Sequence, residues 1–273
     1  MTARAAPTSR VALVTGAARG IGAAIAKGLA ADGVRVAALD VEARALEALP
    51  AEVVKVAADI SEPDQCEAAV RRIAEACGAL DVLINNAGLG MNMIRDDHFA
   101  RPVRIGDIAP AQWRRIFDVN CMGAFLMTRA AVPAMVARGW GRIVNVTTSL
   151  FTMMNEGFAP YGPAKAALES ASAIWAKELD GTGVTVNVLL PGGPTDTSMV
   201  PASSPFARRD LIPVAAMVPP ARWLASPASD GVTGRRFVAA LWPADAPPAE
   251  AAEIAGAPAA WPQLAGNVVW PGR

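Results

Sequence analysis

Short apolar runs alternate along the chain with longer alanine-rich stretches whose apolar positions recur with a helical period. A short apolar run between glycine or polar residues is typical of a strand buried on both faces, and the longer stretches are typical of helices. We therefore expect strands at residues 11–15, 35–39, 53–57, 82–85, 141–146, 184–190 and 236–240. We expect helices at about 22–32, 64–77, 110–137 and 161–181. The alternation predicts an α/β fold, a single Rossmann-type domain in which helices cover both faces of a doubly wound parallel sheet.

The length of 273 residues suits one large domain, with a core at about 9–242 and a tail at 243–273. Two segments, 89–108 and 194–220, interrupt the alternation after a predicted strand. Ligands of such folds bind outside the carboxyl ends of the strands, so both segments are candidate walls of a substrate pocket. For the first, a surface insertion is an equal alternative. The alanine- and proline-rich tail is either a packed arm or a frayed end.

Composition narrows the class of partner. The formal net charge is zero and 53% of residues are hydrophobic, so no field draws the chain to nucleic acid or to an anionic membrane, and a small-molecule substrate is expected. No apolar run has the length of a signal core or a membrane span, which favours a cytoplasmic protein.

Three cysteines without CxxC spacing are expected to stay free thiols. The one histidine, His98, lies among charged residues and is expected at the surface, and no metal site is predicted.

A glycine-rich loop, TGAARGIG at residues 15–22, joins the first strand to the first helix. Glycines at such a junction let backbone N–H groups and the helix N-terminus approach a pyrophosphate. Asp40 ends the next strand, where a carboxylate can bind a ribose 2′-hydroxyl and would repel a 2′-phosphate. The pattern therefore favours NAD over NADP, although Arg19, Arg35 and Arg44 are nearby cations that would soften the preference. The alternative for Asp40 is a solvated carboxylate at a strand end.

Three motifs, all in the same order along the chain, resemble those of the short-chain dehydrogenase/reductases. They are TGxxxGxG at 15–22, NNAG at 85–88 and YxxxK at 161–165, and the resemblance extends over about residues 11–192. It implies that Asp59 and Ile60 flank the adenine and that Asn86 lies by the cofactor ribose. Together with the glycine loop and Asp40, the predicted cofactor contacts are Gly16, Arg19, Gly20, Ile21, Gly22, Asp40, Asp59, Ile60, Asn86, Ala87, Gly88, Tyr161, Lys165, Pro191, Gly192, Thr195 and Thr197.

Tyr161, the only tyrosine, lies four residues before Lys165, so both side chains share one face of the predicted helix. A free phenol titrates near pH 10, and a neighbouring cation lowers that pKa by stabilising the phenolate. The resemblance implies that Tyr161 is the acid/base and that Lys165 tunes it. It also implies that Asn120 holds a water that relays the proton.

Two positions stay open between neighbouring residues. The resemblance implies a hydroxyl that polarises the substrate carbonyl, and its place is taken by Thr148, with Ser149 next to it. Thr148 is preferred, because in an extended backbone Ser149 points the other way. The resemblance also implies a threonine on the nicotinamide carboxamide, and both Thr195 and Thr197 fit its spacing.

These expectations converge on an NAD(P)-dependent oxidoreductase that interconverts a secondary alcohol and a ketone, with Tyr161 as the acid/base. The alternative is a sensor or regulatory protein of the same fold that binds NAD but lost turnover because Thr148 stands where the family that it resembles usually has serine. The resemblance further implies a homodimer or homotetramer, in which helices 110–137 and 161–181 pair between subunits.

Overall fold

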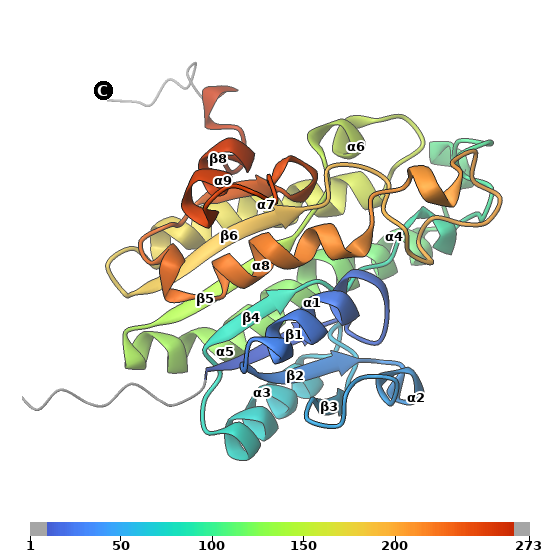
Figure 1. Ribbon diagram of the computed structural model, residues 1–273. Coiled ribbons are helices and arrows are strands. Elements are labelled where there is room, and N and C mark those ends of the chain that lie inside the picture. Colours follow the sequence, from blue (N-terminus) through green and yellow to red (C-terminus); the bar gives the residue numbers. More distant parts are fainter. Residues whose placement is uncertain (1–9, 265–273) are drawn as a thin grey trace, which may run out of the picture.

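A computed structural model describes residues 10–264 and places them around one eight-stranded sheet (Figure 1). The strand order is β3-β2-β1-β4-β5-β6-β7-β8, and every neighbouring pair is parallel except β7 and β8, which are antiparallel. The order reverses between β1 and β4, which confirms the doubly wound α/β fold. The strands are β1 Val11–Thr15, β2 Arg35–Asp40, β3 Val54–Ala57, β4 Val82–Asn85, β5 Gly141–Val146, β6 Val184–Leu190, β7 Arg235–Val238 and β8 Gly256–Pro258.

Helices cover both faces of the sheet and bury two separate apolar cores. In β1, Ala12 and Val14 belong to the core that includes residues of α1 and α8, whereas Val11 and Leu13 belong to the core that includes residues of α3 and α5. This division follows from the two-residue period of a strand. The helices are α1 Gly20–Ala31, α2 Ala43–Leu46, α3 Pro63–Cys77, α4 Pro110–Phe117, α5 Ala124–Arg138, α6 Leu150–Met154, α7 Tyr161–Glu178, α8 Val218–Leu224 and α9 Pro248–Ala255.

The long middle helix is not uniform. A π-helical stretch, Asp118–Gly123, separates α4 from α5, and it carries the buried Asn120. The whole segment Pro110–Arg138 is long and apolar enough to cross a membrane by length and composition alone. Half of its most apolar window is buried inside the protein, as in the core helix of a globular domain. The extra residue per turn in a π stretch changes which side chains face the sheet, and this break has no signature in the apolar pattern.

The end of the chain is a packed arm as far as Ala259. Helix α9 buries Ala251, Ala252 and Ala255, and β8 then pairs with β7. Of the two alternatives for the tail, the packed arm is therefore correct over this part, and residues 265–273 lie outside the described range.

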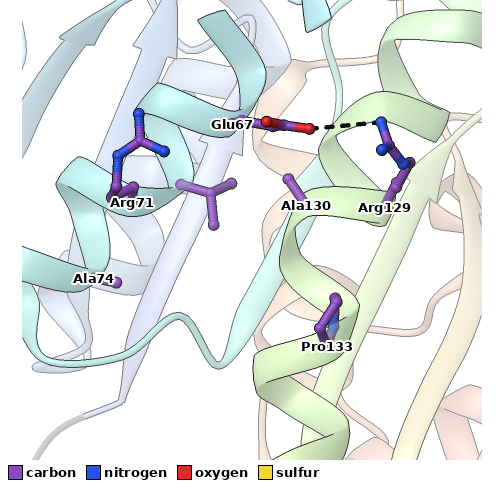
Figure 2. Close-up of a pocket in the computed structure, with 7 residues that line it drawn as sticks. Glu67, Arg71, Ala74, Arg129, Ala130 and Pro133 are labelled. Carbon is purple, nitrogen blue, oxygen red and sulfur yellow. Dashed lines mark ion pairs between the residues drawn. The ribbon is translucent and has the colours of Figure 1, made fainter. Parts of the chain in front are cut away.

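A shallow depression lies between α3 and α5, away from the strand ends (Figure 2). Glu67 and Arg129 form an ion pair of 3.5 Å across it, and apolar atoms of Val70, Ala130 and Pro133 line its floor. It brings together none of the residues predicted for the site.

Candidate active site

A cavity of about 480 Å³ runs along the carboxyl ends of the parallel strands. It is bounded by the segments that follow β1 to β6, which is where a doubly wound fold binds its ligand. Most of the predicted site residues meet there. Those that line it are Gly16, Arg19, Gly20, Ile21, Asp40, Asp59, Ile60, Asn86, Ala87, Gly88, Thr148, Tyr161, Lys165, Pro191, Thr195 and Thr197. Those that do not are Gly22, Asn120, Ser149 and Gly192.

The glycine loop is shaped as a cradle at the N-terminus of α1. Gly16 and Gly20 have φ of 64° and 55°, which favour glycine, and a Cβ on Gly22 would overlap the carbonyl oxygen of Gly16. No side chain among the described residues caps α1, so the first N–H groups of the helix are free to receive an anion. This arrangement fits the pyrophosphate of a dinucleotide.

Asn86 braces this loop from behind. Its Nδ2 donates to the carbonyl oxygens of Thr15 (2.9 Å) and Gly16 (3.1 Å), and the Thr15 hydroxyl accepts hydrogen bonds from the N–H groups of Asn86 and Ala87. Asn85 ties the sheet to α5, since its Nδ2 donates to Thr128 Oγ1 at 3.1 Å. The NNAG segment therefore fixes the glycine loop and the end of β4 relative to each other.

Asp40 lines the cavity at the end of β2. One carboxylate oxygen accepts a hydrogen bond from Ala18 N and the other from Glu42 N, both at 3.0 Å. Two of the three nearby cations are engaged elsewhere: Arg19 pairs with Glu42, and Arg35 donates to the carbonyl oxygen of Ala76, whereas Arg44 forms no ion pair among the described residues. The carboxylate of Asp40 thus has no arginine partner among the described residues.

Asp59 and Ile60 follow β3, and both hold neighbouring segments in place. Burial raises the pKa of Asp59, but hydrogen bonds from Ser61 and Arg115 and the Arg115 charge outweigh burial, so the pKa lies below its ordinary value. Ile60 packs against Gly123, where a Cβ would come within 2.6 Å of its side chain. These contacts join the cavity wall to α4 and to the π-helical stretch.

Tyr161 begins α7 and Lys165 lies one turn later, so the predicted shared face is present. The exposed part of Tyr161 lines the cavity. Burial raises the pKa of Tyr161 to about 12, and a hydrogen bond with Thr148 opposes part of that rise. Burial outweighs any lowering by a cation in this structure, and the tuning of Tyr161 by Lys165 stays a prediction. Lys165 Nζ donates to the carbonyl oxygen of Val146 at 2.8 Å, and burial lowers the pKa of Lys165 to about 8.

Asn120 lies behind the cavity wall. Its Oδ1 accepts from Leu89 N at 2.7 Å and its Nδ2 donates to the Leu89 carbonyl oxygen at 2.9 Å. A Cβ on Gly88 would lie 3.3 Å from Asn120 Oδ1 and 3.4 Å from Lys165 Nζ, so both side chains pack closely against this glycine. Asn120 thus anchors the start of the 89–108 segment, and its role in a water relay stays a prediction.

The two candidate hydroxyls have different surroundings. Thr148 lines the cavity, and its hydroxyl acts to lower the pKa of Tyr161. Ser149 is the N-cap of α6, where its Oγ accepts from Thr152 N at 3.1 Å and lies 2.9 Å from Thr152 Oγ1. Only Thr148 of this pair lines the cavity, and its catalytic role stays a prediction.

Thr195 and Thr197 both line the cavity after β6. The Thr195 hydroxyl donates to the Gly193 carbonyl oxygen at 3.1 Å, and the Thr197 hydroxyl donates to the Thr195 carbonyl oxygen at 3.4 Å. The Thr197 methyl faces Gly20 across the cavity, 3.1 Å from where a Cβ would stand. Both threonines stay candidates for the nicotinamide contact.

Comparison with known proteins gives the family. Residues 10–207 match the short chain dehydrogenase family. The chain belongs to this family and is an oxidoreductase of it. A short-chain type dehydrogenase/reductase of Picea abies is 36% identical over 204 residues, which cover 70% of this chain and 72% of that protein. The reductase FabG of Escherichia coli strain K12, named for 3-oxoacyl-(acyl-carrier-protein), is 34% identical over 217 residues, or 78% of this chain and 83% of that protein.

A solved structure agrees with this assignment. The 3-ketoacyl-(acyl-carrier-protein) reductase from Brucella melitensis, complexed with NADH, is 29% identical with a TM-score of 0.72. The match covers 82% of this chain and 93% of that chain. The short-chain dehydrogenase fold therefore extends beyond the three motifs to most of the molecule.

His98 is not at the surface of this short-chain dehydrogenase, which corrects the expectation from its charged neighbours. Its side chain is only 5% exposed and lines the cavity beside Phe99 and Phe158. Burial lowers the pKa of His98, although a hydrogen bond to Arg95 and nearby carboxylates act in the opposite direction. The signal that was missed is the adjacent pair of rings, His98 and Phe99, within a charged segment that follows a strand end.

Proposed function

We propose that the protein is an NAD-dependent oxidoreductase that interconverts a secondary alcohol and a ketone, with Tyr161 as the acid/base. The observation that carries this proposal is that Tyr161, Lys165 and the Thr148 hydroxyl line one cavity at the carboxyl ends of the strands. The same cavity holds the uncapped N-terminus of α1 and the carboxylate of Asp40. It therefore combines a proton donor, a second hydroxyl and a dinucleotide cradle.

Oxidation of the alcohol removes a hydride from carbon and a proton from oxygen. A nicotinamide bound in the cradle supplies or accepts the hydride. Tyr161 exchanges the proton at its phenol oxygen, and a pKa of about 12 keeps that oxygen protonated at neutral pH. Tyr161 is thus ready to donate to a carbonyl oxygen, whereas alcohol oxidation requires the phenol to lose its proton first. The Thr148 hydroxyl donates to the same substrate oxygen and stabilises the charge that develops there.

Lys165 and Asn120 act through position. The Lys165 ammonium donates a hydrogen bond to the Val146 carbonyl oxygen, and Lys165 also lines the cavity. Asn120 fixes Leu89, which lines the cavity after the NNAG segment. Both side chains are almost fully buried, so their orientations are set by the fold.

NAD is the proposed cofactor, with NADP disfavoured. Asp40 accepts hydrogen bonds from the backbone and forms no ion pair among the described residues, so a 2′-phosphate would meet its like charge. The related Brucella melitensis reductase is complexed with NADH, which supports a nicotinamide cofactor of the non-phosphorylated kind.

We place the protein in the cytoplasm as a homodimer or homotetramer that takes a small alcohol or carbonyl substrate. The assembly is supported by exposed apolar side chains along the π-helical stretch, α5 and α7: Met122 is 47%, Phe125 41% and Ile174 52% exposed. Isolated apolar residues are common at surfaces, but a set that follows two adjacent helices favours a subunit contact.

The test is steady-state oxidation of a panel of secondary alcohols, followed at 340 nm with NAD and with NADP, beside NADH binding by fluorescence. We expect turnover of neutral alcohols and at least a tenfold higher kcat/KM with NAD. NADH binding without turnover of any alcohol, or of any matching ketone in the reverse direction, would contradict the enzyme and support the NAD-binding sensor.

A further inference from the structure

Two segments far apart in the sequence close over the Tyr161 end of the cavity. They meet at the right of Figure 1, where the Ser203 hydroxyl donates to the carbonyl oxygen of Asp96 at 2.9 Å. The rings of Phe99 and Phe206 pack edge to face with centroids 5.2 Å apart. The substrate end therefore has a roof made of both the 89–108 and the 194–220 segments.

Apolar side chains dominate the walls of this end. Beside Tyr161 and Lys165, the only titratable group that lines it, among the described residues, is His98. The apolar side chains are Leu89, Met91, Met93, Phe99, Phe158 and Met199. Methionine and aromatic walls accept an apolar body of irregular shape.

The arginines around the cavity are already paired. Arg115, which lines the opposite end, pairs with Asp59. Within the two roof segments the arginines also face carboxylates: Arg95 with Asp107, Arg101 with Asp97, Arg104 with Glu156, Arg208 with Asp196 and Arg209 with Asp210. An anionic substrate group at this end would lose its hydration without gaining an unpaired arginine, which is unfavourable.

Asn92, Thr152 and Ser198 also line the cavity, and His98 is the imidazole of the apolar wall. Its Nδ1 lies 3.1 Å from the carbonyl oxygen of Arg95, and because a carbonyl only accepts, Nδ1 carries the hydrogen. The ring packs against Phe99 at 4.2 Å between centroids and against the edge of Phe158 at 6.2 Å. In the neutral ring Nε2 is then an acceptor, and it has no partner within the described part of the chain.

We propose, on the basis of the function proposed above, that the substrate is a small uncharged ketone or secondary alcohol with an aromatic or branched apolar body. We further infer that this body carries a hydroxyl group that donates a hydrogen bond to His98 Nε2. His98 is then a specificity-determining residue. This substrate class differs from the carrier-bound acyl groups in the names of several relatives.

The first test compares substrates on the wild-type enzyme with NAD. The panel contains 1-phenylethanol, the three isomers of its ring-hydroxylated derivative, the anion 3-hydroxybutyrate and a 3-hydroxybutyryl group on acyl carrier protein. We expect one hydroxylated isomer to exceed 1-phenylethanol at least tenfold in kcat/KM, and both the anion and the carrier-bound group to fall at least tenfold below it. Preference for the anion or the carrier-bound group would overturn the inference.

The second test measures the preference ratio, kcat/KM for the best hydroxylated isomer divided by kcat/KM for 1-phenylethanol. His98→Phe keeps an aromatic ring but removes the acceptor, so the ratio should fall to about one, chiefly through KM. His98→Gln keeps an acceptor and should recover part of the ratio. Calorimetric binding of the matching hydroxyacetophenone to the enzyme saturated with NAD should weaken in the same order. An unchanged ratio in His98→Phe would overturn the role of His98.

The experiments distinguish a failure of this inference from a failure of the proposed function. If the enzyme turns over neutral alcohols without any hydroxyl preference, this inference fails and the proposed function stands. If NADH binds but no member of the panel reacts in either direction, the proposed function fails and this inference falls with it.

Discussion

Burial decides the protonation of the two central side chains. It moves the pKa of Tyr161 up to about 12 and the pKa of Lys165 down to about 8, so both are pushed toward their uncharged forms. The sequence correctly places the pair on one helix face, because a spacing of four residues fixes that geometry. It does not give the depth of the pair, which raises the pKa of the phenol, or the carbonyl of Val146 to which the ammonium donates.

Thr148 and Ser149 give a test at the level of one hydroxyl. Thr148→Ala removes the group beside Tyr161 and should lower kcat roughly 100-fold, the size seen when one donor to a developing oxyanion is lost. Ser149→Ala removes only the cap of α6 and should lower the free energy of unfolding by about 1 kcal/mol, with kcat within about threefold of wild type. Steady-state rates and chemical denaturation measure both effects. The opposite order of rates would move the catalytic role to Ser149.

Lys165→Met tests the buried ammonium through stability. The pKa of Lys165 is about 8 in the folded protein and 10.5 as the ordinary value, so between these pH values the unfolded chain binds more protons. The free energy of unfolding of wild type should therefore rise with pH across this window relative to the variant, by up to about 3 kcal/mol. Urea denaturation of both proteins from pH 7 to 10 measures the difference. Parallel curves would mean that the pKa of Lys165 is not lowered.

At the scale of elements, strands follow from sequence better than helices. The expected bounds of β1, β4, β5 and β6 agree with the structure, because buried parallel strands are continuous apolar runs. Strand β8, Gly256–Pro258, has no such run and depends on its pairing with β7. The π-helical stretch that positions Asn120 was also missed, since the apolar period continues through it.

Gly183, at the turn into β6, tests how closely two connections pack. Gly183 has φ of 81° and an added Cβ would overlap the Gly139 carbonyl oxygen, whereas Gly33 has φ of 78° with open space around it. Gly33→Ala should cost about 1–2 kcal/mol from backbone strain alone. Gly183→Ala should cost about 1–3 kcal/mol more because the contact forces the backbone apart. Urea denaturation of the two variants compares these costs, and equal losses would show that the overlap relaxes freely.

At the scale of the whole molecule, the site depends on contacts that no local motif records. The motifs predict which residues follow which strand ends, and the structure brings most of them to one cavity. The substrate end is different, because its roof joins Asp96 to Ser203 and Phe99 to Phe206, more than 100 residues apart in sequence. His98 became a wall residue only through this packing, which explains why the sequence placed it at the surface.

Glu169 links the site to the end of the chain. It is fully buried on α7, accepts from Thr147 Oγ1 at 3.1 Å and pairs with Arg236 of β7 at 2.8 Å. Glu169→Gln leaves the guanidinium of Arg236 nearly buried without a counter-ion, and should lower the free energy of unfolding by about 3–5 kcal/mol. Glu178→Gln, at an exposed position of the same helix, is the matched control with an expected change under about 0.5 kcal/mol. Denaturation curves that coincide for the two variants would contradict a structural role for this ion pair.

The central claim is that Tyr161 moves the proton between the substrate oxygen and the protein. Its most direct test is single-turnover formation of NADH at 340 nm by wild type and by Tyr161→Phe, with the best alcohol of the panel and saturating NAD. The account predicts a fall of about 10³-fold in the rate constant, with NADH affinity within about threefold of wild type, because only the phenol oxygen is removed. A rate in Tyr161→Phe within tenfold of wild type would contradict it.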